Sequence, residues 1–204
     1  MVKIVVASGN AGKVKELTEL LNGLDIEVLS LKDFRDIGEI EEDGTTFTEN
    51  AIKKARTVTA ATGLIAMADD SGLEVDYLEG APGIYSARFA GEARDDLQNN
   101  MKLLSLLKDL PDDKRTARFR CVIAVSTPWG ETHTAEGACY GVVGREMRGD
   151  KGFGYDPLFY LPEYGKTFAE LESETKNRIS HRGKALAQAK GVLTTIIERV
   201  GAEL

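Results

Sequence analysis

Cysteine and histidine are scarce in this chain of 204 residues, which contains two of each. Cys121 and Cys139 do not form a C-x-x-C pair, and a disulfide framework would need more cysteines in a chain of this length, so we expect both thiols to be reduced. His133 and His181 cannot supply the clustered nitrogen ligands of a zinc or copper site. A bound metal is therefore expected to be a hard ion with oxygen ligands, which favours Mg²⁺.

Long apolar runs and an excess of basic residues are also lacking. The longest apolar stretches, residues 4–7 and 64–68, are far too short to cross a bilayer, and residues 1–3 lead directly into a strand pattern rather than a signal peptide. We therefore expect a cytoplasmic protein that is not embedded in a membrane. The net charge of −7 argues against a nucleic-acid-binding protein, because such binding needs a basic surface. A small phosphorylated ligand needs only a local cluster of bases.

The composition is otherwise balanced, with 42% hydrophobic and 29% charged residues and no repeat or biased tract. These proportions are typical of a globular protein that buries a continuous core. We predict a single domain over residues 1–204, with room for two lobes around one sheet. Strands alternate with helical crossovers, and the alternating residues 117–125 followed by the turn residues 128–130 predict a hairpin. The order of elements therefore predicts an α/β domain with a mixed sheet.

The first turn of the chain has the features of a phosphate-binding loop. Residues 3–7 have the pattern of a buried strand, and the apolar spacing after residue 13 predicts a helix. Exposed backbone N–H groups and the helix dipole favour an anion at such a junction. The pattern is not a Walker A loop, because its glycines are too close together and Val14 replaces the magnesium-binding hydroxyl. The alternative is an ordinary turn with a surface lysine. The loop consists of Ser8, Gly9, Asn10, Ala11, Gly12 and Lys13.

Carboxylates gather in two further segments. Residues 39–43 form an acidic run, which by itself is usually a solvated loop. The strand expected at residues 64–68 is followed by Asp69 and Asp70, so we expect both carboxylates at a strand end. There they would be placed to hold Mg²⁺ while the ion keeps several waters and binds substrate phosphates. The alternative for this pair is a turn with its own capping hydrogen bonds.

Two predicted helices can be compared with a structure residue by residue. One is expected to begin at a capping box formed by Thr46 and Glu49. The other has apolar residues at helical spacing, which predicts its buried face. This predicted face consists of Leu97, Met101, Leu104 and Leu107.

Aromatic and basic side chains gather in the last third of the chain. Residues 153–157 combine two rings, a flexible glycine and a carboxylate. Aromatic faces stack on bases, and a carboxylate can accept hydrogen bonds from the N–H groups of a base. The alternative is a tight turn with its aromatic rings in the core. Lys176, Ser180, His181 and Arg182 place further donors before the last predicted helix, where they would suit an anion or a keto oxygen, although Ser180 would also serve as an N-cap.

In this combination and order the motifs resemble the Ham1 or inosine triphosphate pyrophosphatase family over essentially the whole chain. The resemblance implies an elongated mixed sheet flanked by helices, two lobes with a central cleft, and a homodimer. It also implies Mg²⁺-dependent hydrolysis of the non-standard purine triphosphates ITP, dITP and XTP to the monophosphate and pyrophosphate, which cleanses the nucleotide pool. The segments that carry it are SGNAGKVKE, EEDGTTFTENAIKKA, ADDSG, GAPGIYSARFAG, GFGYDP and SHRGKA.

The resemblance also implies roles for individual residues. Phosphate binding falls on residues 8–13 and Lys54, and the metal ligands are Glu41 and Asp70, of which Asp70 is also the general base. As a hypothesis for selectivity, Arg182 and His181 would donate to the 6-keto oxygen, which adenine replaces with an amino group. The positions implied for base recognition are Ser71, Phe153, Gly154, Tyr155, Asp156, Lys176, His181 and Arg182.

Two other functions fit parts of the same pattern. A regulatory module that binds a purine triphosphate without cleaving it would have similar loops, but it would not need the acidic pair of Glu41 and Asp70. A pyrophosphatase of the related Maf type would act on pyrimidine or modified nucleotides. The GFGYDP and SHRGKA segments argue against the Maf type.

Overall fold

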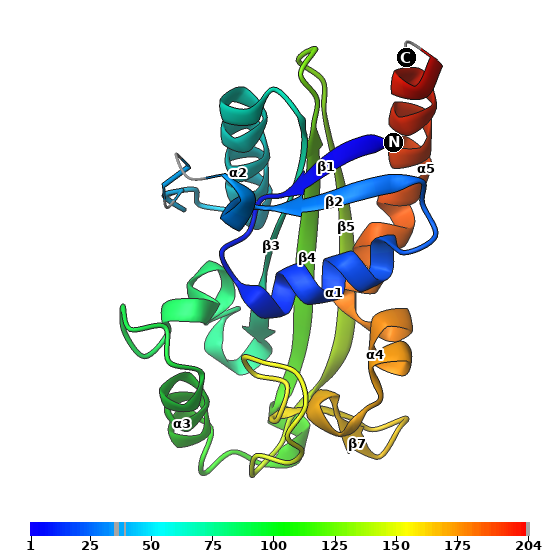
Figure 1. Ribbon diagram of the computed structural model, residues 1–204. Coiled ribbons are helices and arrows are strands. Elements are labelled where there is room, and N and C mark those ends of the chain that lie inside the picture. Colours follow the sequence, from blue (N-terminus) through cyan, green and yellow to red (C-terminus); the bar gives the residue numbers. More distant parts are fainter. Residues whose placement is uncertain (35–36, 39, 203–204) are drawn as a thin grey trace. The chain divides into compact units, whose positions relative to one another are not determined.

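The computed structural model describes residues 1–34, 37–38 and 40–202, and Figure 1 shows its helices and strands. One sheet has the strand order β2-β1-β3-β4-β5-β6-β7. β1 pairs in parallel with β2 and β3, whereas β6 pairs antiparallel with β5 and β7. The prediction of an α/β fold with a mixed sheet is confirmed. The strands are β1 (Val2–Val6), β2 (Ile26–Ser30), β3 (Ile65–Val75), β4 (Thr116–Ser126), β5 (Thr132–Val143), β6 (Phe159–Leu161) and β7 (Lys166–Thr167).

The helices differ widely in length, and the chain also makes short 3-10 turns between them. The α-helices are α1 (Ala11–Leu21), α2 (Phe47–Thr62), α3 (Asp96–Leu106), α4 (Ser173–Ile179) and α5 (His181–Ala202). The 3-10 turns are Leu31–Asp33, Asp76–Leu78, Gly83–Arg88, Asp112–Lys114 and Phe168–Glu170. Within the described ranges, no helix is both long enough and apolar enough to span a membrane.

The chain divides into two compact units, which are described separately. Unit 1 consists of Met1–Asp70, Cys121–Gly137 and Arg182–Leu204, and unit 2 consists of Ser71–Arg120 and Ala138–His181. Strands β3, β4 and β5 contribute residues to both units. Both cysteine thiols are buried, Cys121 in unit 1 and Cys139 in unit 2.

The core of unit 1 forms around its parallel strands. Ile4 and Val6 of β1 belong to one apolar cluster, together with Leu17 and Leu21 on the predicted inner face of α1. Val5 is also fully buried. Because neighbouring side chains of a strand point to opposite faces, β1 is covered on both sides, as is usual for a parallel strand. α5 adds Leu186, Ala189, Leu193 and Ile196 to the same cluster.

Aromatic rings form the core of unit 2. The ring of Phe119 lies edge-on to Phe159 and parallel to Phe168, with centroid distances of 4.7 and 5.7 Å. Leu73 of β3 and Leu103 of α3 belong to the same cluster. This core therefore combines residues of β3, α3 and β4 with Phe159 and Phe168 from the last third of the chain.

The predicted strand end at Asp69 and Asp70 is wrong. β3 continues from Ile65 to Val75 without a break, so both carboxylates lie within the strand. Asp-Asp-Ser-Gly is typical of a turn, but these two carboxylates are bound by side chains from other elements. Position 72 has room only for glycine, because a Cβ there would lie 2.3 Å from the Gly83 carbonyl oxygen and would clash with it.

The predicted buried face of α3 is only half right. Leu107 is buried and Leu104 is partly buried in the core of unit 2, but Leu97 and Met101 are each 52% exposed. Asn99 is buried instead, and its amide accepts a hydrogen bond from the backbone N–H of residue 90 and donates one to the carbonyl of residue 87. A buried amide is tolerated when its hydrogen bonds are made. Hydrophobic spacing cannot identify such a residue.

Candidate active site

The loop after β1 leads into a capped helix. Asn10 is the N-cap of α1, and its side-chain oxygen accepts a hydrogen bond from the backbone N–H of Lys13 at 3.1 Å. The backbone N–H of Asn10 donates to the Ser8 hydroxyl at 3.2 Å. The N–H groups of Ala11 and Gly12 belong to the first helical turn, which has no carbonyl partners within the helix. The structure therefore contains the helix N-terminus that the sequence predicts after residue 10, and such an N-terminus favours an anion.

The lysine of this loop is not a free surface residue. Lys13 is 15% exposed, and its ammonium lies 2.9 Å from Oδ1 of Asp69, which is fully buried in β3. This ion pair orients the Lys13 side chain at the end of the loop of residues 8–13. The alternative of an ordinary turn with a surface lysine does not describe this side chain.

Asp69 is the centre of a buried ionic cluster in unit 1. Its Oδ2 accepts hydrogen bonds from Nε and Nη2 of Arg182 at 3.0 and 2.8 Å. The Nη1 of Arg182 donates to Glu16 of α1, so all three guanidinium nitrogens donate to carboxylates. Burial by itself would raise the pKa of Asp69, but the positive charges of Arg182, Lys13 and Lys54 hold it well below the ordinary value of 3.8. Asp69 is therefore a charged structural centre.

Asp70 belongs to a second cluster, built around the ammonium of Lys54. Lys54 of α2 donates to Oδ1 of Asp70 at 3.0 Å, to Oε1 of Glu42 at 2.7 Å and to the backbone carbonyl of Asp69 at 2.6 Å. The Nδ2 of Asn50, one turn earlier in α2, donates to the other oxygen of Asp70 at 3.2 Å. These bonds fix the position of the Asp70 carboxylate at both of its oxygens.

Burial and charge act against each other in this second cluster. Burial raises the pKa of Asp70 above its ordinary value of 3.8 by more than the ammonium groups of Lys54 and Lys13 lower it. The negative charge of Glu42 adds to the increase. Burial alone would lower the pKa of Lys54, but the attraction of Asp70, Glu42 and Asp69 outweighs it, and the pKa of Lys54 is raised. Both directions follow because three carboxylates attract the ammonium of Lys54, whereas burial is the largest influence on Asp70 and the charge of Glu42 adds to it.

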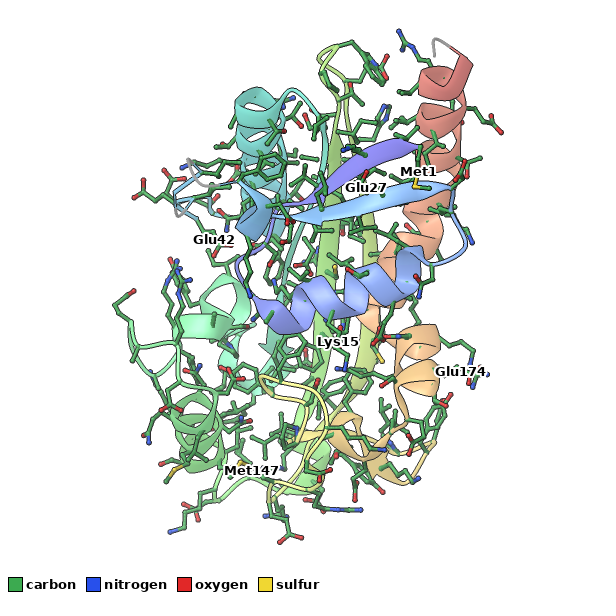
Figure 2. The ribbon with its side chains drawn as sticks, viewed as in Figure 1. Met1, Lys15, Glu27, Glu42, Met147 and Glu174 are labelled. Carbon is green, nitrogen blue, oxygen red and sulfur yellow. The ribbon has the colours of Figure 1, made fainter. Side chains whose placement is uncertain are left out.

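The acidic run before α2 places one carboxylate at this cluster. Glu42, labelled in Figure 2 on the segment that precedes α2, has a side chain that is 28% exposed and forms the ion pair with Lys54. Glu41, the metal ligand that the resemblance implies, is exposed. Its role as a ligand stays a prediction. Glu39 of the same run lies outside the described residues.

Unit 2 brings together three of the residues implied for base recognition. Oδ2 of Asp156 accepts hydrogen bonds from the backbone N–H of Phe153 at 2.9 Å and from the Lys176 ammonium at 2.5 Å. The same ammonium lies 5.3 Å from the centroid of the Phe153 ring, within the range of a cation–π contact. Gly152 leaves room for this carboxylate, because a Cβ there would lie 2.0 Å from Oδ2 of Asp156. The arrangement combines a fixed carboxylate, a cation and a partly exposed ring.

Other implied residues have different surroundings. Tyr155 is buried, and its hydroxyl donates to the backbone carbonyl of Ser86 at 2.9 Å, so its ring is part of the unit 2 core. The His181 ring stacks on Phe119 at a centroid distance of 4.6 Å. Gly154 donates its backbone N–H to Asp96 at 2.7 Å. Ser71 lies in β3 and is partly buried.

Sequence reasoning missed Asn50 and the role of Glu42, and it reached Lys54 only through the resemblance. A signal for two of them was present. Phe47, Ala51 and Ala55 form the buried stripe of α2, and Asn50 and Lys54 fall at helical spacing within it. A polar residue in an apolar stripe is buried only when it has partners, so such positions are candidates for a site. No comparable pattern identifies Glu42.

The fold and the clusters of unit 1 define a mixed-sheet α/β protein with paired acidic and basic groups of the kind that handle phosphorylated ligands. Residues 4–192 match the sequence profile of the Ham1 family, and the chain belongs to this family.

Named relatives and solved structures cover nearly the whole chain. A protein of Desulforamulus reducens named dITP/XTP pyrophosphatase is 61% identical over 194 residues, which are 95% of this chain and 96% of the relative. A Listeria monocytogenes protein of the same name is 52% identical, with 98% of both chains covered. The Coxiella burnetii HAM1 protein has a TM-score of 0.85 at 45% identity, with 96% of this chain and 100% of that chain covered. The Staphylococcus aureus Ham1 protein has a TM-score of 0.83 at 41% identity, with 95% and 98% covered.

Proposed function

We propose that the protein is a Mg²⁺-dependent nucleoside triphosphate pyrophosphatase that converts dITP, XTP and ITP to the monophosphate and pyrophosphate. The observation that carries the proposal is the set of the buried Asp70 and Lys54 with the partly buried Glu42 in unit 1. A protein that only bound a nucleotide would not need buried carboxylates beside its phosphate loop. The choice of nucleotide rests on relatives named dITP/XTP pyrophosphatase at 61% and 52% identity.

The residues around Lys54 fit a hard divalent cation. The three oxygens that bind its ammonium belong to two carboxylates and a backbone carbonyl, and these are the ligand types that Mg²⁺ prefers. Asp70 and Glu42 would hold the ion, with Glu41 as the ligand that the resemblance implies. When bound, the ion would neutralise the developing charge on the phosphate oxygens.

The remaining chemistry belongs to side chains of unit 1. Asp70 has a raised pKa, which brings a carboxylate closer to the range of an effective general base. It would accept the proton of a water whose oxygen attacks the α-phosphorus, while the bond to the bridging oxygen breaks and pyrophosphate leaves. Asn50 orients Asp70 through the other carboxylate oxygen. Lys13 and the amides at the start of α1 would bind the phosphate oxygens.

The role of Arg182 in base selection stays a prediction. Arg182 is 1% exposed, and its three guanidinium nitrogens donate to Asp69 or Glu16. We propose that the pair of Lys176 and Asp156, also implied by the resemblance, contributes to base selection, because an ammonium and a carboxylate suit the keto and N–H edge of hypoxanthine or xanthine.

A product analysis with a nucleotide panel tests the proposed function. Purified protein with Mg²⁺ is incubated with dITP, XTP, ITP, dATP, dUTP and dTTP, and the products are separated by chromatography and followed by phosphorus NMR. We expect monophosphate and pyrophosphate from dITP, XTP and ITP. Release of inorganic phosphate alone would contradict the bond assignment. Binding without cleavage would identify a regulatory module, and faster cleavage of dUTP or dTTP would identify the Maf type.

Two further properties are proposed from the resemblance. A homodimer is checked by light scattering of the purified protein, and a monomer at all concentrations would contradict it. A cytoplasmic location would place the enzyme with the nucleotide pool, and fractionation of cells checks it.

A further inference from the structure

The ammonium of Lys54 lies where a divalent cation would bind. It is buried, and three oxygens surround it at 2.6 to 3.0 Å: Oε1 of Glu42, the carbonyl of Asp69 and Oδ1 of Asp70. Each of these oxygens is a suitable ligand for a hard cation. The lysine therefore already uses the oxygens that a metal ion would need.

A second cation at these three oxygens would be repelled by the ammonium. Like charges a few ångströms apart repel strongly where water is excluded, and both Lys54 and Asp70 are buried. The Glu42 side chain is 28% exposed, so the three-oxygen set is open to solvent on the side of Glu42. The flexible four-carbon stem of the lysine allows its ammonium to move while α2 stays in place.

We propose that Lys54 is a built-in counter-ion that excludes the divalent cation from the nucleotide-free protein. The ammonium leaves the three oxygens when the triphosphate arrives, and it then neutralises phosphate oxygens while the divalent cation takes its place. This proposal rests on the proposed function, because it assumes a metal-bound nucleotide. It predicts weak metal binding by the free protein and mutual enhancement of metal and nucleotide binding, since coupling between two ligands is reciprocal.

A metal titration without nucleotide tests the exclusion directly. Mn²⁺ serves as the probe, and electron paramagnetic resonance measures its free concentration with the wild-type protein and with Lys54→Met. We expect the variant to bind Mn²⁺ about tenfold more tightly or more, the scale on which neighbours of metal ligands change metal affinity. Unchanged or weaker binding by the folded variant would overturn the proposal.

Lys53 provides a matched control in the same helix. It pairs with Asp43 at 2.6 Å and lies outside the three-oxygen set. Lys53→Met removes the same charge from the next position, so it is expected to leave Mn²⁺ affinity within about twofold of the wild type, because an exposed charge is largely screened. An equal gain in both variants would show a general effect of net charge and would also overturn the proposal. Adding Glu42→Gln to Lys54→Met should reduce the gain, because it removes a ligand.

A measurement on the wild-type chain covers the case in which Lys54→Met does not fold. Lysine acetylation is followed by mass spectrometry with and without saturating Mg²⁺ and without nucleotide. Because the ammonium and the ion compete for the same oxygens, the nucleotide-free site is expected to fill only at a large excess of Mg²⁺. Lys54 should therefore stay protected at low Mg²⁺ and react faster at saturating Mg²⁺, with Lys53 as the internal reference. An unchanged ratio of the two rates would contradict displacement.

The failure of this proposal differs from failure of the proposed function. If the wild-type protein cleaves dITP and XTP but Lys54→Met gains no Mn²⁺ affinity, the function stands and the counter-ion role is wrong. If Lys54→Met gains Mn²⁺ affinity but the wild-type protein cleaves no nucleotide, the counter-ion role stands and the pyrophosphatase assignment is wrong.

Discussion

Asp69 and Asp70 are adjacent in β3, yet their carboxylates have different surroundings. Neighbouring side chains of a strand point to opposite faces. Asp69 is bound by Arg182 and Lys13, and positive charge keeps it ionised. Asp70 is bound by Asn50 and Lys54, and burial raises its pKa. One residue is thus suited to hold the structure together, and the other is suited to accept a proton.

Asp69→Asn is expected to destabilise the protein. The substitution removes one of the two carboxylates that bind the buried guanidinium of Arg182, and breaking a buried ion pair typically costs about 3 to 5 kcal/mol in free energy of unfolding. Urea unfolding followed by circular dichroism measures the change. Asp25→Asn, at an exposed position of unit 1, is the matched control and should have little effect. Equal stability of the two variants would show that the pair contributes nothing.

The same substitution should also change the pH dependence of stability. The pKa of Asp69 in the folded protein lies well below 3.8, so the ionised form stabilises the fold above the unfolded pKa. This contribution is lost as the pH falls below the unfolded value toward the folded one. Wild-type stability should therefore fall more steeply than that of Asp69→Asn when the pH is lowered from about 5 to about 2. Parallel curves would contradict the assigned charge state.

Asp70→Asn is expected to lower kcat on dITP by about a hundredfold or more, the scale on which enzymes lose activity without a general base. The amide keeps the shape of the side chain but cannot accept the proton of the attacking water. Steady-state release of pyrophosphate measures the loss, and a thermal unfolding curve checks that the variant is folded. Near-normal turnover would remove Asp70 from the proposed role.

At the scale of elements, α2 links the acidic run before it to the aspartates of β3. Asn50 and Lys54 lie in its buried stripe and bind Asp70 of β3, and Lys54 also binds Glu42 in the segment before the helix. The predicted helix start at Thr46 is confirmed, because Thr46 is the N-cap and its hydroxyl accepts a hydrogen bond from the backbone N–H of Glu49. The Glu49 carboxylate also accepts hydrogen bonds from the backbone N–H and hydroxyl of Thr45, one residue before the N-cap. The helix start was predictable, whereas the reach of its side chains was not.

Gly72 is the residue that allows β3 to continue past the aspartates. A Cβ at this position would lie 2.3 Å from the Gly83 carbonyl oxygen and 2.4 Å from the Ser86 hydroxyl. Gly72→Ala is therefore expected to destabilise the protein by about 1 to 3 kcal/mol, the usual effect of overpacking. Gly191→Ala in α5 has open space and should stabilise by up to about 1 kcal/mol, because alanine is the better helix former. Thermal unfolding of both variants checks these opposite signs.

For the whole molecule, local periodicity predicted most elements because a buried face repeats along a strand or a helix. The alternating residues of β4 and the inner face of α1 are examples. The errors arose where a polar side chain is buried because its hydrogen bonds or ion pairs are made. Asn99, bound to backbone groups of residues 87 and 90, is buried where Leu97 and Met101 were expected. Arg182 contacts Asp69 across 113 positions of the chain, and the local sequence does not identify such a partner.

The two units carry different chemistry, and their substitutions should have different kinetic signatures. Lys13 in unit 1 belongs to the loop that we propose binds phosphates, and it pairs with Asp69. Phosphates are common to all nucleoside triphosphates. Lys13→Met should therefore lower kcat/KM by a similar factor for dITP, XTP and dATP. The expected factor is about tenfold or more, because a charged hydrogen bond contributes about 1.5 to 3 kcal/mol.

Lys176 in unit 2 is bound to Asp156 and lies near the ring of Phe153, and these groups suit a base rather than a phosphate. Lys176→Met should therefore change the ratio of kcat/KM for dITP and dATP, while Mn²⁺ binding without nucleotide stays at the wild-type level. Lys151→Met, at an exposed position of the same unit, is the control and should leave that ratio unchanged. A Lys176 variant that loses activity equally on every nucleotide would show that this residue acts on folding or on phosphate binding. Selection of the base would then have to come from other groups.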